Sequence, residues 1–138
     1  MRNAIHYALL TIPAAALLVA CGGSDDAPTP VAPVVTTTTI SGSAVKGPVN
    51  GATVRAKKAD GTACGSATTN AQGTYNLETT CTGDLIIEVT GGTYTDEATS
   101  QNRSLDTPLR VVVAANGGTV TGIATPLTTM AYTYAFGT

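Results

Sequence analysis

The chain has 138 residues, of which 43% are hydrophobic, and its seven Lys or Arg and nine Asp or Glu give a formal net charge of −2. This length suits one domain with a tether. Its basic residues cluster only at Arg55, Lys57 and Lys58. A nucleic-acid surface needs larger clusters of Lys and Arg, so we expect no nucleic-acid partner.

The N-terminus is laid out as a secretory signal. One cation, Arg2, precedes a largely apolar run, Ala4–Ala20, and the next residue is Cys21. The run is slightly short for a membrane span, and Pro13 would kink it. The alternative is an ordinary signal cut before a free cysteine, but ordinary cleavage favours a small residue at the position of Leu18.

The stretch Leu18-Val19-Ala20-Cys21 resembles the lipobox of bacterial lipoproteins. The resemblance implies that residues 1–20 are a lipoprotein signal peptide. It also implies that Cys21 becomes the first residue of the mature protein, carrying diacylglycerol and palmitate. Three acyl chains would anchor it stably to a membrane. Gly22 follows the cysteine in place of aspartate, which among Gram-negative lipoproteins implies the outer membrane, facing the periplasm or the cell surface.

Removing residues 1–20 also removes His6, the only histidine of the chain. The remainder has no imidazole for general-base catalysis, for a Ser-His-Asp or Cys-His arrangement, or for binding a metal. An oxidising compartment favours a disulfide between Cys64 and Cys81 over two separate buried thiols. A metal pair would lack further ligands to complete its shell. We therefore expect no catalytic residues, no cofactor and no enzyme.

Residues 21–37 are predicted to form a disordered, Pro- and Thr-rich tether with a reach of about 50 Å, at ~3.1 Å per residue. A folded domain is predicted over residues 38–124. Its first strands are expected at Thr39–Lys46 and Ala52–Lys57, the second because apolar and polar residues alternate strictly. That alternation assigns the polar side chains of the second strand to a solvated face and not to a binding site.

A short strand is expected at Ser66–Asn70. It is followed by a tight turn in which Gly73 takes a positive φ, and by a strand that buries Tyr75 and Leu77. The next strand is expected at Asp84–Thr90, and the polar loop that follows it runs to about Thr107. The last two strands, with a hairpin signal at Asn116-Gly117 between them, are expected at Pro108–Ala114 and Thr119–Ile123.

Two stretches, Gly51–Val54 and Thr69–Tyr75, resemble the hallmarks of the carboxypeptidase regulatory-like (transthyretin-like, prealbumin-like) β-sandwich family. Asn70 stands where that family usually has aspartate, and both residues cap such turns. The resemblance covers roughly Ile40–Val89, and Gly91–Thr99 is similar to a module in surface lipoproteins of proteobacteria. It implies a β-sandwich with an accessory role beside a catalytic or transport domain.

The same fold hosts a hydrolase of purine breakdown, which has a histidine-and-arginine site and a C-terminal Tyr-Arg-Gly-Ser. This chain has neither, so that activity does not carry over. We predict an all-β fold, a small antiparallel β-sandwich of six to seven strands. Its core is expected to contain Ile40, Val54, Tyr75, Leu77, Leu85, Ile87, Val89, Leu109, Val111, Val113 and Val120.

The last segment, residues 125–138, is predicted to form a short amphipathic helix with Thr125 as N-cap and Pro126 in the first turn. About three turns are too few to be stable without packing. Either this helix caps the sandwich, or it begins a longer region of the protein that the sequence does not include. Its apolar face would be formed by Leu127, Met130, Ala131 and Tyr134.

Two weak site hypotheses remain in the polar loop. Asp96, Glu97 and Asp106 are candidate calcium ligands, because hard cations take carboxylate oxygens, although a solvated acidic loop is the simpler interpretation. Tyr94 is the candidate for a carbohydrate-binding surface, which normally uses exposed aromatic rings.

The sequence as a whole favours a non-catalytic, membrane-anchored lipoprotein. Its β-sandwich would serve as a spacer, adhesion or interaction module in the cell envelope. One alternative is an N-terminal accessory domain of a longer envelope enzyme or transport-associated protein, and another is a carbohydrate-binding module. The expected partners are the membrane, through the lipid anchor, and a protein or glycan that the sequence does not identify.

Overall fold

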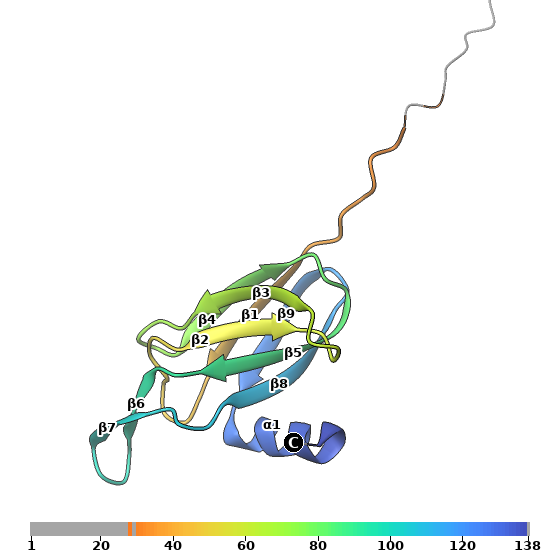
Figure 1. Cartoon of the computed structure of the whole chain (residues 1–138). Helices are drawn as coiled ribbons and strands as arrows, with labels where there is room; N and C mark the ends of the chain where they lie inside the picture. The colour runs from red at the N-terminus through yellow and green to blue at the C-terminus, as the bar shows by residue number, and fades with distance from the viewer. Residues whose placement is uncertain (1–27, 29, 138) are drawn as a thin grey trace, which may run out of the picture. The chain divides into compact units, whose positions relative to one another are not determined.

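The computed structural model describes residues 28 and 30–137 (Figure 1). The predicted signal peptide, residues 1–20, and the predicted lipidation site, Cys21, lie outside these residues. Residues 30–37 have no regular secondary structure, and Val34 is 88% exposed. Within the described part of the chain, no helix is both long and apolar enough to cross a membrane.

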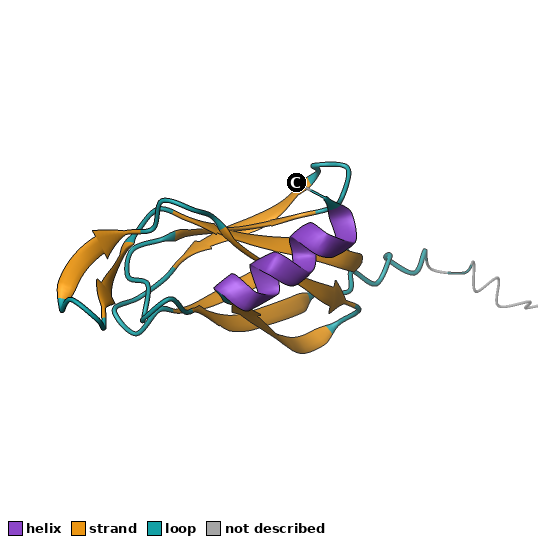
Figure 2. Ribbon diagram, turned by 90° about the horizontal axis from the view of Figure 1, so that it is seen from below, coloured by secondary structure: helices purple, strands orange, loops and turns teal. Residues whose placement is uncertain are grey.

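The described residues form two sheets that pack face to face around one apolar core, so the predicted β-sandwich is confirmed (Figures 1 and 2). The three-stranded sheet has the order β4 (Thr74–Thr79), β1 (Thr38–Ala44), β9 (Gly118–Ala124). The four-stranded sheet has the order β3 (Ala63–Thr68), β2 (Thr53–Lys57), β5 (Gly83–Thr90), β8 (Leu109–Ala115).

One strand pair departs from the antiparallel order that the sequence favoured. β1 and β9 run parallel, from Thr38 opposite Gly118 to Ala44 opposite Ala124. The other strand pairs of the described residues are antiparallel. A parallel pair needs a long connection, and here the connection is the rest of the domain. Local hairpin signals could not indicate this pairing.

The prediction of one long polar loop that reaches Thr107 is wrong. This segment contains a hairpin of β6 (Thr93–Asp96) and β7 (Gln101–Ser104), which projects from one end of the sandwich (Figure 1). All four residues of β7 are exposed, and Tyr94 is the buried residue of β6. A strand pair with so little buried surface lacks the apolar alternation by which strands are found in a sequence.

The turn between β3 and β4 has the predicted form. The Asn70 side-chain oxygen accepts hydrogen bonds from the backbone N–H groups of Gln72 and Thr74, each at 3.0 Å. Gly73 has a φ of 75°, and a Cβ at that position would lie 2.7 Å from the carbonyl oxygen of Ala44. The turn therefore requires glycine both for its backbone conformation and for its close approach to the neighbouring chain.

Nine of the eleven predicted core residues are buried, while Val111 and Val120 are partly buried and pack against the core. Both lie in β8 and β9, the edge strands on one side of the sandwich, where less of each side chain is covered. The core also contains residues that the prediction missed, mostly alanines and residues of turns: Ala44, Val49, Ala52, Ala56, Tyr94, Leu105, Ala115 and Ala124.

Helix α1 (Pro126–Phe136) begins where the sequence predicts. The Thr125 hydroxyl accepts a hydrogen bond from the Thr128 N–H at 3.1 Å, and the Thr128 hydroxyl accepts one from the Thr125 N–H at 2.8 Å, which forms a capping box. The helix runs across one side of the sandwich, along β8 (Figure 2). There the Arg110 N–H donates to the Thr129 hydroxyl at 2.8 Å.

The apolar face predicted for this helix is turned away from the sandwich. Leu127, Met130 and Tyr134 are 74%, 68% and 95% exposed. The helix instead meets the sandwich through threonines and through Tyr132, whose ring lies under the Arg110 guanidinium at 5.4 Å. Contacts with the edge strand β8, including the hydrogen bond from Arg110 to Thr129, determine which side of the helix faces the sheet. The spacing of apolar residues does not reveal such contacts.

Candidate functional site

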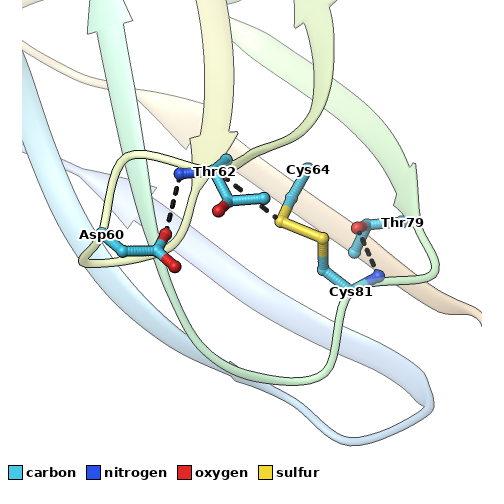
Figure 3. Close-up of a disulfide and its surroundings, with 5 residues drawn as sticks. All are labelled: Asp60, Thr62, Cys64, Thr79 and Cys81. Atoms are coloured by element: carbon cyan, nitrogen blue, oxygen red, sulfur yellow. Dashed lines mark hydrogen bonds between the residues drawn. A yellow bond between two sulfur atoms is a disulfide. The ribbon is translucent and has the colours of Figure 1, made fainter.

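The two cysteines predicted to pair form a disulfide that joins the two sheets. Cys64 lies in β3 of the four-stranded sheet, and Cys81 follows β4 of the three-stranded sheet (Figure 3). Their Cα atoms are 5.7 Å apart, and Cys64 is 8% exposed. The bond closes the side of the sandwich opposite α1, so neither sulfur is available as a thiol nucleophile or as a metal ligand.

Hydrogen bonds between residues two positions apart stabilise the segments around this disulfide. The Cys81 N–H donates to the hydroxyl of buried Thr79 at 3.0 Å, and the Thr62 N–H donates to the Asp60 carboxylate at 2.8 Å (Figure 3). The hydrogen bond from Thr62 lowers the pKa of Asp60. The Cys64 sulfur lies 3.6 Å from the Thr62 carbonyl oxygen, a contact without a proton, because a disulfide sulfur carries none.

A charged cluster lies on the outer face of the four-stranded sheet. The Glu88 carboxylate accepts hydrogen bonds from Arg110 Nε at 2.8 Å and from Lys57 Nζ at 3.2 Å. The Glu88 side chain is only 15% exposed. Burial acts to raise its pKa, but the hydrogen bonds from Arg110 and Lys57 outweigh this, and the pKa is lowered. The cluster links the middle of the sheet, β2 and β5, to the edge strand β8.

A shallow depression of about 440 Å³ lies beside this cluster. Arg55 and Lys57 form one wall, and small residues of β3, such as Gly65 and Ser66, form the other. Arg55 is exposed as predicted, whereas Lys57 is partly covered and engaged with Glu88. The arrangement offers cationic and hydroxyl groups for hydrogen bonding but no nucleophile activated by a neighbouring base.

The structure does not gather the candidate calcium ligands into a metal site. Among the described residues, no three His, Cys, Asp or Glu side chains group together in a way that could hold a metal ion. The Asp96 carboxylate accepts hydrogen bonds from the N–H groups of Ala98 and Thr99 and pairs with Arg103 at 3.4 Å. The hydrogen bond from Thr99 lowers the pKa of Asp96 most. Asp96 therefore caps the β6–β7 turn, while Glu97 and Asp106 are exposed.

Tyr94, the candidate for an exposed sugar-binding ring, is buried at 8% exposure. Lys46 lies over its ring at 5.2 Å, so one face of the ring is covered by a cation. Tyr94 is therefore not the exposed aromatic ring that the carbohydrate-binding hypothesis needs. The ring instead anchors the projecting β6–β7 hairpin to the sandwich, because alternation along β6 turns it inward.

The Glu88 cluster is the feature that sequence reasoning missed. The alternation in β2 placed Lys57 on an outward face, but its contact with Glu88, 31 residues later in the chain, depends on the register between β2 and β5. One local signal was available, since an outward glutamate in a run as apolar as β5 needs a charged or hydrogen-bonding partner.

Comparisons with protein families and with curated proteins find no match to the chain. Among solved structures, the chain is similar to BcpA, the major pilin subunit of Bacillus cereus, at 22% identity and a TM-score of 0.45, over 65% of this chain and 29% of that chain. A variant of the same pilin matches at 23% identity and a TM-score of 0.45, over 64% and 29%. The chain thus spans less than a third of the pilin chains it matches.

Proposed function

We propose that the chain is a membrane-anchored lipoprotein whose carboxypeptidase regulatory-like β-sandwich acts as a non-catalytic spacer or interaction module in the cell envelope. The anchor would be Cys21, with residues 21–37 as the tether. The membrane would be the outer membrane of a Gram-negative cell, because Gly22 follows the cysteine.

The observation that carries the proposal is the pairing of the lipobox-like stretch before Cys21 with the Cys64–Cys81 disulfide. Stable disulfides belong to oxidising compartments, which are reached by export across the membrane. The two features are independent, because one lies in the exported leader and the other joins the two sheets. The mature sequence also lacks histidine and tryptophan, which supports a structural or binding role over a catalytic one.

The test is the intact mass of the native protein extracted from its own membranes, with and without reductant. We expect the mass of a chain that starts at Cys21 and carries added glyceryl and acyl groups. This mass should increase by two hydrogens on reduction. An unmodified thiol at Cys21 would remove the anchor. A much larger species would mean that the sandwich is the accessory domain of a longer protein.

The membrane to which the protein is sorted can be tested separately. Gly22→Asp should move the protein from the outer to the inner membrane on a density gradient, while Gly22→Ala, the matched control, should leave it in place. An unchanged distribution for the aspartate variant would contradict the outer-membrane assignment. It would leave the lipid anchor, as read by mass, intact.

A further inference from the structure

Helix α1 carries a row of large apolar side chains that the sandwich does not cover. Leu127, Met130 and Tyr134 are 74%, 68% and 95% exposed, and their spacing of three and four residues places them on one side of the helix. We refer to these three residues as the apolar ridge. Val45 and Ile123, 41% and 46% exposed, lie near the start of the helix, because the Val45 N–H bonds to the carbonyl oxygen of Ala124.

Such a ridge needs an explanation, since exposed apolar residues are ordinary when scattered but indicate an interaction surface when gathered. All three belong to an 11-residue helix, and none of the described residues of α1, Pro126–Phe136, is buried. A helix of three turns is marginal without packing. A surface that binds the apolar ridge would therefore also stabilise the helix.

The charges around the helix favour a lipid surface as the occupant. The sequence Pro126–Phe136 contains no Asp, Glu, Lys or Arg, so no ionised group of the helix would have to lose water. Two cations, Lys46 and Arg110, lie beside the helix, and Arg110 is also hydrogen-bonded to Glu88. Lys46 lines a groove of about 260 Å³ with Met130, and Arg110 stacks on Tyr132. Tyrosine rings and cations beside an apolar strip match the interface between acyl chains and headgroups.

We propose that α1 lies flat on the bilayer with the apolar ridge inserted among the headgroups and the first part of the acyl chains. At about 16 Å, an 11-residue helix is too short to cross the membrane, and an interfacial position suits it. The inference rests on the proposed lipid anchor at Cys21. The tether of residues 22–37 would hold the domain within about 50 Å of that anchor. Three side chains alone bind weakly, but tethering supplies a high local concentration of bilayer.

The test uses the lipidated protein in vesicles of phosphatidylcholine carrying brominated acyl chains, which quench nearby tyrosines. Four tyrosines follow Cys21. Tyr75 and Tyr94 are buried and serve as an internal background, whereas Tyr132 and Tyr134 report on the helix. We expect a loss of tyrosine emission relative to vesicles of the unbrominated lipid. The loss should fall to background in the double variant Leu127→Ser/Met130→Ser, which keeps both reporters.

The matched control is Val34→Ser/Val35→Ser, which removes two equally apolar side chains, 88% and 64% exposed, outside the helix. It should leave the quenching unchanged, and circular dichroism should show that both double variants are folded. Protein that floats with the vesicles but shows no quenching overturns the membrane-bound helix and leaves the anchor standing. Protein that does not float refutes the anchor instead. Cross-linked dimers that disappear in Leu127→Ser/Met130→Ser, without quenching, would assign the ridge to a second copy and also overturn the proposal.

Discussion

The Tyr75 hydroxyl donates a hydrogen bond to the carbonyl oxygen of Gly122, from one edge strand of the three-stranded sheet to the other. Between them lies β1, where Gly42 is in register with both residues. A Cβ at Gly42 would lie 1.9 Å from the Gly122 oxygen and 2.5 Å from the Tyr75 hydroxyl oxygen. The tyrosine ring thus occupies space that two glycines leave free, and one side chain ties all three strands together.

Tyr75→Phe should destabilise the domain by about 1–2 kcal/mol, because it deletes a buried hydrogen bond without changing the packing of the ring. Gly42→Ala should cost more, because the added methyl group meets the backbone of β9 and the tyrosine together. Urea unfolding measures both, with Thr119→Ser on the exposed face of β9 as the control. Equal stability of Tyr75→Phe and the parent would mean that the hydrogen bond contributes nothing.

Alkaline pH should weaken the parent more than it weakens Tyr75→Phe. Burial raises the pKa of Tyr75 to about 12, above its ordinary value of 10.0. A group whose pKa is raised on folding loses its contribution as the pH rises from the unfolded to the folded value. The stability difference between the two proteins should therefore shrink between pH 10 and 12, by at most about 2 kcal/mol. Unfolding curves at pH 8 and 11.5 test this, and a constant difference would contradict it.

Breaking the Cys64–Cys81 disulfide should lower the free energy of unfolding by about 3 kcal/mol, since the bond closes a loop with a sequence separation of 17. The measurement is the urea midpoint of Cys64→Ser/Cys81→Ser against the oxidised parent. Reductant should bring the parent down to the variant and leave the variant unchanged. If reductant did not change the urea midpoint of the parent, the disulfide would not be formed in the protein.

Acid should remove the contribution of the Glu88 cluster. The pKa of the Glu88 carboxyl is lowered from its ordinary value of 4.5. Its contribution to stability is therefore present above pH 4.5 and is lost as the pH falls through the pKa of the folded state. Glu88→Gln should cost about 1 kcal/mol at pH 7 and less at pH 3, below the ordinary pKa of the carboxyl group. Glu97→Gln, at an exposed site, is the control and should change stability at neither pH. A pH-independent cost for Glu88→Gln would indicate packing in place of charge.

Two glycines with similar backbone angles separate strain from steric conflict. Gly61 and Gly73 have φ of 88° and 75°, but a Cβ at Gly61 meets nothing within 4 Å, whereas at Gly73 it meets Ala44 and Val49 at 2.7 and 2.9 Å. Gly61→Ala should cost about 1 kcal/mol from the left-handed backbone alone. Gly73→Ala should cost clearly more by thermal unfolding. Equal costs would mean that the turn relaxes without resistance.

The sequence predicted best where local chemistry and packing agree. The alternation in β2, the apolar run of β5 and the Asn70–Gly73 turn each specify their own conformation, and the threonine cap marks the start of α1. The β6–β7 hairpin was missed because its strands are polar, and the parallel pairing of β1 with β9 was missed because it joins the two ends of the domain.

Site predictions failed wherever a side chain's surroundings come from distant segments. Tyr94 was the candidate for a sugar-binding ring, which would have to be exposed, yet Lys46 and the sandwich cover it. Glu88 of β5 meets Lys57 and Arg110 only through the register of three neighbouring strands, which the sequence does not show. The cysteine pairing, by contrast, followed from the count of cysteines, because only two remain once Cys21 is assigned to lipid.

The parallel pair of β1 and β9 has a mechanical consequence. The chain enters β1 at Thr38 and leaves β9 at Ala124, and these two residues lie at opposite ends of the paired strands. Tension between these two points would slide the strands along each other, loading their hydrogen bonds together instead of opening them one after another. A pull applied between Thr38 and Ala124 would therefore act on the hydrogen bonds of this strand pair in shear, so that they would have to break together.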